Sequence, residues 1–224
     1  MYDIELLNNA IITEPLTEDE KQLLVSNMTK VSYAKGERII KTGEFVTHAV
    51  FINKGFVKIH SENKGKTVIF NIFGPGSFSG LALMIGLDKH DFDITALDDS
   101  TIFLIDIFIL RNLIVQNGLF ARSLVSYMNS TLMYYIHHNI VFLTQSNIHG
   151  RLANALLYLS QEVFYNNDFD LMLSRKELSQ FCNISRENVI KVLYEFKSDG
   201  LIKLDGKRIY ILNSEQLKRL ADIC

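Results

Sequence analysis

Short runs of alternating hydrophobic and polar residues fill the first half of the chain and predict β-strands. The clearest runs are Ala49–Ile52, Phe56–His60, Thr67–Phe73 and Thr101–Ile105. Glycines separate these runs, at Gly36, Gly43, Gly55, Gly65, Gly74, Gly76, Gly80 and Gly86. Short strands divided by glycine turns are typical of a sandwich or barrel, which we place over residues 1–112. A helix over Thr17–Met28, with Thr17 as its cap and Glu20 behind it, is expected before the strands.

A long helical period follows over Leu119–Gln145, with no proline or glycine inside it. Its hydrophobic positions recur at alternating steps of three and four, which makes a heptad seam of about three repeats. The seam predicts that residues 113–147 form a dimerisation helix, and packing of the seam against its own β domain is the alternative. The residues on the seam are Val125, Met128, Leu132, Tyr135, Asn139 and Phe142.

The helical pattern is expected to break at Gly150, and an amphipathic helix is expected over Arg151–Phe164. A short helix should then begin after Ser174 and end at Cys182. Ser174 stands three residues before Glu177, so the two side chains can cap this helix reciprocally.

A second helix is expected over Arg186–Ser198, with Ser185 as its cap. Its inner side carries hydrophobic residues at helical spacing, namely Val189, Val192, Leu193 and Phe196. Arg186, Glu187 and Lys191 fall on the other side, near the helix end that enters the major groove in a helix-turn-helix. Arg and Lys can donate to guanine N7 and O6, and Glu can accept from the cytosine amino group. These three residues are therefore the predicted base-reading set.

A β-hairpin wing is predicted after this helix, because Asp205-Gly206 is a strong turn signal between Leu201–Leu204 and Arg208–Leu212. The wing would bring positive charge next to the phosphates of DNA. The predicted contacts to the DNA backbone are Ser174, Arg175, Ser185, Lys203, Lys207 and Arg208. Residues 148–224 are thus expected to form a winged helix-turn-helix domain.

The composition is that of an ordinary folded protein, with 48% hydrophobic and 21% charged residues among 224. Asp3 and Glu5 occupy the place of a basic signal-peptide region, and the most apolar run, Ile102–Leu110, is too short to span a bilayer. Only Cys182 and Cys224 are present, which excludes a disulfide framework or a four-thiolate iron–sulfur cluster within one chain. These features predict a cytoplasmic protein with no membrane partner.

The charge is uneven along the chain, although the net charge is only −2. Residues 1–147 carry 12 Lys and Arg against 15 Asp and Glu, whereas residues 148–224 carry 11 against 10. Binding to nucleic acid would therefore depend on a local basic face and not on bulk charge.

With its elements in this order, the whole chain resembles the cyclic-AMP receptor protein and fumarate/nitrate-reduction regulator family, Crp/Fnr. The resemblance lies in Lys35-Gly36-Glu37 with Gly43, Ile52-x-x-Gly55-x-Val57, Gly74-x-Gly76-x-Phe78-x-Gly80, Gly150-Arg151-Leu152-Ala153 and Ser185-Arg186-Glu187-x-Val189-x-Lys191. It implies an α+β fold with an N-terminal β-roll (a cyclic-nucleotide-binding-like jelly roll), a long dimerisation helix and a C-terminal winged helix-turn-helix. It also implies a homodimeric transcription regulator, not an enzyme, on a palindromic promoter site in double-stranded DNA, with RNA polymerase as a further partner.

The cyclic-nucleotide site of the family does not carry over to this sequence. In the cyclic-nucleotide binders a Glu follows the glycine matching Gly80 and an Arg-Ser pair holds the phosphate, but here the residues are Leu81 and His90-Asp91. With Asp93 nearby, two carboxylates would repel an anion. We therefore expect an unidentified small-molecule effector other than cyclic AMP, and DNA binding without any effector is the alternative. The more apolar pocket expected for it contains Phe70, Ile72, Gly80, Leu81, Leu83, Ile94, Ile136 and His137.

Three alternative functions have less support in the sequence. A haem- or nitric-oxide-sensing regulator of the same fold would have His90 and His137 as candidate ligands, although no cofactor is otherwise predicted. A cupin-type metal enzyme needs clustered histidines, but the sequence contains no His-x-His and no metal site is predicted. A sensor that has lost DNA binding and acts through protein partners conflicts with the intact base-reading set.

Overall fold

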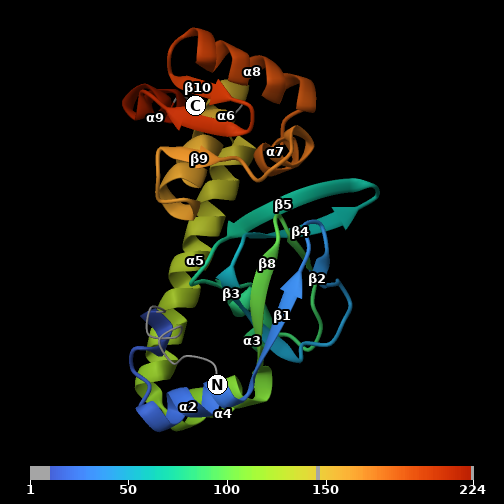
Figure 1. Cartoon of the computed structure of the whole chain (residues 1–224), viewed down its shortest axis with the longest axis vertical. Coiled ribbons are helices and arrows are strands. Elements are labelled where there is room, and N and C mark those ends of the chain that lie inside the picture. Colours follow the sequence, from blue (N-terminus) through green and yellow to red (C-terminus); the bar gives the residue numbers. More distant parts are fainter. Residues whose placement is uncertain (1–10, 145–146, 223–224) are drawn as a thin grey trace. The chain divides into compact units, whose positions relative to one another are not determined.

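The computed structural model describes residues 11–144 and 147–222, without the side chains of residues 11, 82–84, 134–135 and 137–144. The chain divides into two compact units (Figure 1). One contains Met1–Ser61 and Ile72–Tyr135, and the other contains Glu62–Asn71 and Ile136–Cys224. Among the described residues, every helix is too short or too polar to traverse a lipid bilayer.

The N-terminal half of the chain folds into two four-stranded sheets, as the alternating pattern predicts. Its strands are β1 (Met28–Tyr33), β2 (Arg38–Ile40), β3 (His48–Lys54), β4 (Val57–Asn63), β5 (Lys66–Phe73), β6 (Phe78–Ser79), β7 (Asp93–Ala96) and β8 (Ser100–Asp106). One sheet has the order β1-β8-β3-β6, and the other has the order β2-β7-β4-β5. The pairings of β8 with β1 and β3, and of β7 with β2 and β4, are antiparallel. The β-roll is thereby confirmed.

Aromatic side chains fill the core of the first sheet. Phe51 lies 4.9 Å from Phe78 and 6.5 Å from Phe103 between ring centroids, and all three are buried. Each such ring removes a large apolar area from water, which is the main source of stability for a sheet of short strands.

Short helices flank the β-roll: η1 (Ile11–Thr13), α2 (Glu18–Ser26), α3 (Leu81–Gly86) and α4 (Ile107–Gln116). The predicted cap of α2 is confirmed, because the Thr17 backbone N–H donates to Glu20 Oε2 at 2.8 Å and the Glu20 backbone N–H donates to Thr17 Oγ1 at 3.3 Å. The expected helix extends too far, however, since Asn27 ends α2 and Met28 begins β1. Helix α4 was not predicted, and its start is marked by Asp106, whose Oδ1 accepts from the Phe108 N–H at 2.8 Å.

Helix α5 (Gly118–Thr144) is continuous and matches the predicted long period (Figure 1). Of the expected seam residues, Val125 and Leu132 are exposed and Met128 is half-buried. Exposure of the first two argues against their packing on the β-strands of the same chain. The other three seam side chains, Tyr135, Asn139 and Phe142, lie outside the described residues.

The C-terminal helices are α6 (Ile148–Tyr158), the π-helical turn η2 (Leu159–Val163), α7 (Arg175–Cys182), α8 (Arg186–Ser198) and α9 (Ser214–Asp222). The prediction that Gly150 breaks the helical pattern is wrong, because Gly150 is buried inside α6. The helix begins earlier, where Asn147 Oδ1 accepts from the His149 backbone N–H at 3.0 Å. A single glycine costs a helix only about 1 kcal/mol, which the burial of its neighbours readily offsets.

The predicted wing is present, with a turn one position later than expected. Strands β10 (Ile202–Asp205) and β11 (Arg208–Ile211) pair so that Asp205 faces Arg208, and the two turn residues are therefore Gly206 and Lys207. A third strand that was not predicted, β9 (Asp168–Asp170), pairs with β11. The α+β fold class, with an N-terminal β-roll and a C-terminal winged helix-turn-helix, is confirmed.

The turn between β3 and β4 depends on Gly55. Its φ is +87°, and a Cβ on this residue would lie 2.7 Å from Ser100 Cα. The neighbouring loop is itself fixed, because Asp98 Oδ1 accepts from the Phe56 N–H at 2.6 Å and from the Ser100 hydroxyl at 3.2 Å. A backbone atom held in this way has little freedom to move aside.

We expect Gly55→Ala to lower the free energy of unfolding by about 3 kcal/mol or more, because left-handed strain and steric overlap add together. Gly36→Ala is the matched control, since Gly36 has a φ of +86° but open space around it, and it should cost about 1 kcal/mol. Urea unfolding followed by circular dichroism measures both. Equal losses would show that the contact with Ser100 has no effect.

Candidate nucleic-acid interface

Helix α7 begins at the capping box that the sequence predicts. The Ser174 backbone N–H donates to Glu177 Oε2 at 2.8 Å, and the Glu177 backbone N–H donates to Ser174 Oγ at 3.2 Å. On its inner side the helix buries Leu178, Phe181 and Cys182. Burial raises the pKa of the Cys182 thiol, so this cysteine is a neutral core residue and not a reactive thiolate.

Two features fix the turn between α7 and α8: the backbone conformation of Asn183 and a hydrogen bond from α6. Asn183 has a φ of +51°, a left-handed conformation that asparagine tolerates better than most residues. Its carbonyl oxygen accepts from Arg151 Nη1 at 2.9 Å, which joins the turn to α6. The angle at which α8 leaves the turn is therefore set by the domain core.

Helix α8 buries its hydrophobic side and leaves its predicted base-reading side exposed. Ser185 Oγ accepts from the Asn188 backbone N–H at 3.2 Å, which confirms the expected cap. The four inner residues are all buried, namely Val189, Val192, Leu193 and Phe196. Arg186, Glu187 and Lys191 are exposed near the N-terminal end, so the structure brings all three to one accessible surface.

Two carboxylates shape the charge of this surface. Hydrogen bonds from its own backbone N–H and from Ser185 lower the pKa of Glu187, which keeps it an acceptor at neutral pH. Glu195, one turn beyond Lys191, has Oε2 at 2.7 Å from His149 Nε2 and Oε1 at 3.8 Å from Lys191 Nζ. The hydrogen bond between His149 and Glu195 ties α8 to the start of α6, and the exposed pair of Lys191 with Glu195 contributes little to stability.

Of the predicted wing cations, Arg208 is engaged within the protein. Its Nε and Nη2 donate to Asp168 Oδ1 and Oδ2 at 2.6 and 2.9 Å, a bidentate pair between β11 and β9. The hydrogen bonds from Arg208 hold the pKa of Asp168 below its usual value. The pair is therefore ionised at neutral pH, and acid breaks it only as the pH falls through that lowered pKa.

The other two wing cations differ from Arg208. Lys203 is exposed, and its Nζ lies 5.0 Å from the centroid of the Tyr210 ring, within cation–π distance. Lys207 is exposed at the wing turn and has no salt bridge to any described residue. The sequence did not predict the ion pair of Asp168. Its strand, β9, has three residues with a single apolar one, so it gives almost no alternating pattern.

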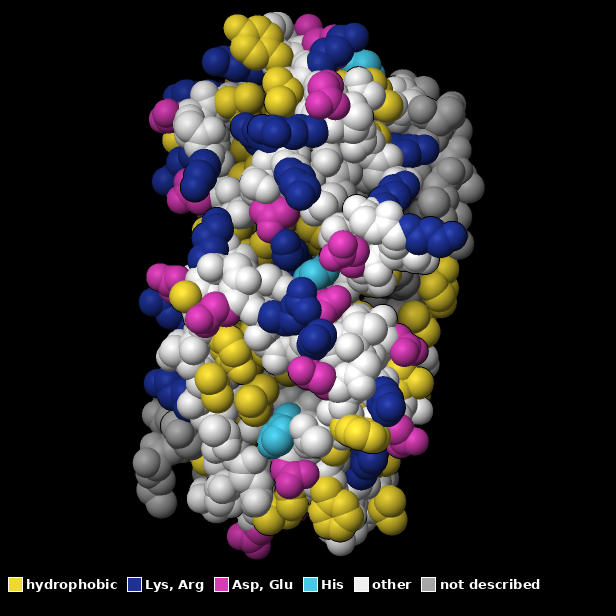
Figure 2. All heavy atoms as spheres, turned by 90° about the vertical axis from the view of Figure 1, so that its right-hand side faces the viewer, with side chains coloured by type: hydrophobic (Ala, Val, Ile, Leu, Met, Phe, Trp, Pro, Cys, Tyr) yellow, Lys and Arg dark blue, Asp and Glu magenta, His cyan; other side chains and the backbone are white. Residues whose placement is uncertain are grey.

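The remaining predicted backbone contacts lie around the helix ends. Ser174 and Ser185 are exposed and serve as helix caps, whereas Arg175 is half-buried and burial lowers its pKa. Figure 2 shows Lys and Arg side chains along most of one face, more frequently in its upper half, where Figure 1 labels α7 and α8. Acidic and hydrophobic side chains are interspersed among them, so the surface is locally basic but not uniformly so.

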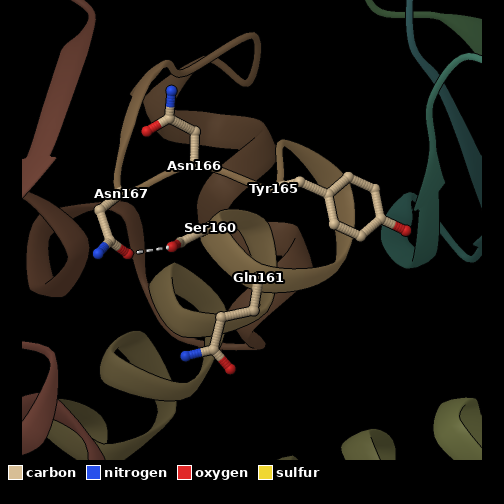
Figure 3. A pocket seen from close by; sticks show the side chains of 5 residues that line it. All are labelled: Ser160, Gln161, Tyr165, Asn166 and Asn167. Carbon is tan, nitrogen blue, oxygen red and sulfur yellow. Dashed lines mark hydrogen bonds between the residues drawn. The ribbon is translucent and has the colours of Figure 1, made fainter.

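A hollow of about 430 Å³ lies beside η2, where the π-helical turn leads towards β9 (Figure 3). Its lining consists of Ser160, Gln161, Tyr165, Asn166 and Asn167, and Ser160 Oγ donates to Asn167 Oδ1 at 2.8 Å. Tyr165 has a φ of +51° and is 80% exposed, and its ring points away from the amides. The hollow offers neutral hydrogen-bonding groups and no charge, so it does not suit a phosphate.

The predicted effector-pocket residues differ in how deeply they are buried. Ile72, Leu81 and Ile94 are buried in the hydrophobic core, and Gly80 is also buried. Phe70 is half-buried and Ile136 is exposed. The side chains of Leu83 and His137 lie outside the described residues.

His90 is the unusual polar residue of this region. It is buried beside Phe92, with ring centroids 5.5 Å apart, and its Nδ1 has no hydrogen-bond partner among the described residues. Burial lowers the pKa of His90, against a smaller opposing effect of Glu44, so the imidazole is neutral at pH 7. A neutral ring at the position where the cyclic-nucleotide binders have Arg cannot neutralise a phosphate.

The nearby Asp93 is already satisfied within the protein. Its Oδ2 accepts from the Thr42 hydroxyl at 3.2 Å, and its Oδ1 lies 3.4 Å from Arg38 Nε. Arg38 and Asp93 thus neutralise each other, so neither this pair nor the neutral His90 supplies a positive charge for a phosphate.

Comparison with protein families matches residues 30–117 to the cyclic nucleotide-binding domain and residues 150–220 to the Crp-like helix-turn-helix domain. The CRP-like cAMP-activated global transcriptional regulator of Mycobacterium tuberculosis is 26% identical over 222 residues, covering 97% of this chain and 99% of the relative. The transcriptional activator protein Anr of Pseudomonas protegens is 26% identical over 192 residues, covering 84% and 78%.

Among solved structures, FixK2 from Bradyrhizobium japonicum is similar, with a TM-score of 0.81 at 21% sequence identity. The match covers 88% of this chain and 98% of that one, and at this identity it supports the fold alone.

The ion pair on the wing predicts unequal roles for two neighbouring cations. Lys207→Ala should lower the slope of log affinity for double-stranded DNA against log salt by about 0.9 per protomer, as expected for one lost phosphate contact. Arg208→Ala should change the slope less, because Asp168 already neutralises Arg208, and Asp168→Asn should steepen it. Fluorescence anisotropy over a series of salt concentrations measures all three. Equal effects of the two alanine variants would contradict this assignment.

Proposed function

Since the chain belongs to the Crp/Fnr family of transcription regulators, we propose that it binds a palindromic promoter site in double-stranded DNA as a homodimer and regulates transcription there. We propose the division expected from the sequence: a β-roll effector-sensing domain over residues 1–112, a dimerisation helix over 113–147 and a DNA-binding domain over 148–224.

The observation that carries this proposal is the exposed surface of α8. Arg186, Glu187 and Lys191 stand together on a helix whose other side is buried and whose start is capped. Arg186 and Lys191 supply donors for guanine, and the ionised Glu187 supplies an acceptor for the cytosine amino group. We assign phosphate contacts to Ser174, Arg175, Ser185, Lys203 and Lys207, with Arg208 contributing only when it leaves Asp168.

The apolar seam of α5 supports dimerisation. Val125 and Leu132 are exposed at heptad spacing on a helix of 27 residues, and a second copy of the helix would cover them. A twofold dimer presents two copies of α8 to two half-sites one turn of DNA apart, which is why a palindromic site is expected.

The effector is proposed to be a small molecule other than a cyclic nucleotide. The relative from Mycobacterium tuberculosis is named as cAMP-activated, but in this chain buried Leu81, neutral His90 and the carboxylate of Asp93 stand in the stretches expected to bind the nucleotide. The effector would act by population shift, favouring the arrangement in which both copies of α8 fit the DNA. Its differential affinity for the two arrangements limits the size of the response.

Haem remains the alternative for the sensing domain. Buried His90, whose Nδ1 has no partner among the described residues, is the observation in its favour. A Soret band in the absorption spectrum of the purified protein would identify haem, and we expect none. The cupin-type enzyme has less support, since the relatives are named as transcriptional regulators and activators.

RNA polymerase is the proposed protein partner, and both act in the cytoplasm. The exposed Tyr165, held in a left-handed turn at the rim of the neutral hollow, is our candidate for the contact surface. An exposed aromatic side chain suits such a contact, because it can bury a large apolar area on binding.

The central test is selection of bound sequences from a random double-stranded DNA pool. We expect a palindromic consensus whose half-sites are separated by one helical turn. Glu187→Ala should relax the preference at one base pair, at a cost of about 1–3 kcal/mol in discrimination, because the acceptor for the cytosine amino group is lost. Sequencing of the pools selected by the wild type and the variant measures this. No enriched sequence, with or without added metabolites, would refute the proposal.

The double variant Val125→Asp, Leu132→Asp should convert the dimer to a monomer, because the dimer would bury two unpaired carboxylates from each protomer, each at a cost of several kcal/mol. Sedimentation velocity measures the association. Ser126→Asp adds a carboxylate to an exposed position off the seam and should leave the dimer intact. A double variant that remains dimeric would place the interface elsewhere.

A further inference from the structure

Two large hydrophobic side chains stand exposed on the recognition helix α8. Ile190 is 48% exposed and Tyr194, one turn later, is 68% exposed. Both residues lie outside the buried side of the helix, which includes Val189 and Val192. An isolated exposed isoleucine is common, so its position relative to the base-reading set decides whether it has a role.

Ile190 lies between the predicted base-reading residues. With about 100° of rotation per residue, it is about 40° around the helix from Arg186 and about 60° from Glu187. It stands about 6 Å along the axis beyond Arg186 and about 1.5 Å before Lys191. A helix that brings Arg186, Glu187 and Lys191 to base edges therefore brings Ile190 to the same groove.

The chemistry of the major groove gives this side chain one natural partner. The polar atoms on base edges form hydrogen bonds with donors or acceptors of a protein, and the side chain of Ile190 contains neither. The C5-methyl group of thymine is the apolar group that a base presents there. An isoleucine placed against any other base would remove water from polar atoms without replacing its hydrogen bonds, which is unfavourable.

We propose that Ile190 is a specificity-determining residue that reads a thymine by contact with its C5-methyl group, within the stretch of half-site bounded by the bases of Arg186 and Lys191. This inference rests on the proposed function and adds an apolar reader to its polar set. Tyr194, farther along the helix, is suited to a phosphate through its hydroxyl group.

Replacement of thymine by uracil tests the contact directly, since it removes the methyl group and leaves base pairing unchanged. In the half-site that the wild type selects, each thymine is replaced by uracil in turn, and the affinity is measured by anisotropy with the full chain. We expect one position per half-site to lose about fourfold in affinity, the value of one buried methyl group. Uracil at the other thymine positions should change the affinity less than twofold.

The variant Ile190→Ala completes a double-mutant cycle with the uracil substitution. It should bind thymine DNA as weakly as the wild type binds DNA that carries uracil at this position in both half-sites, and uracil should weaken it no further. Alanine is a good helix former and the site is half exposed, so the fold should be unaffected. Ile190→Val keeps a branched apolar group and should retain sensitivity to uracil.

Leu212→Ala is the matched control, because Leu212 is 60% exposed in the same domain but follows β11 and is not on α8. It should show the wild-type response to uracil. The inference is overturned if the wild type binds its consensus without any response to uracil, or if Ile190→Ala still responds. Both results leave the proposed function intact, whereas failure of the wild type to select any sequence refutes the function itself.

Discussion

The burial of one side of α8 is the constraint on which the DNA-facing surface depends. Val189, Val192, Leu193 and Phe196 each contribute about 1.5–3 kcal/mol when removed from water, and together they allow the helix only one rotation about its axis. That rotation decides which residues face outwards. The Ser185 cap and the bond between Arg151 and the Asn183 carbonyl then fix where the helix starts. Polar residues on the exposed side are thus positioned by contacts that they do not make themselves.

Most of the interface could be predicted from the sequence because its signals are local. The two serine caps and α8 each depend on residues within a few positions of one another. Strand β9 could not be predicted, since its three residues pair with a strand some 40 positions away and contain one apolar side chain, Phe169. The prediction that Gly150 breaks the helix was wrong for a related reason. Helix propensity is a weak preference, and the buried packing of α6 overrides it.

The fold of the β-roll could be predicted from the sequence, but the identity of a ligand could not. The β-roll is specified by alternation and by glycine turns, and both are visible along the chain. The effector is specified by the few polar groups that a pocket presents, and in this chain the residues at the cyclic-nucleotide positions are apolar, neutral or already paired, as Leu81, His90 and Asp93 illustrate. The residues exclude a type of ligand more readily than they identify one, because apolar contacts discriminate weakly between small molecules.

The pair between Asp168 and Arg208 separates two properties that regulators must adjust independently. Strand β9 supplies the carboxylate that neutralises Arg208 on the wing. In the proposed interface it would therefore set how much positive charge the wing offers to any DNA, while α8 would set which bases are preferred. A single nucleotide change that turns an aspartate codon into an asparagine codon would alter the first without altering the second. Occupancy of all target promoters can therefore drift up or down together during evolution while the set of target genes stays the same.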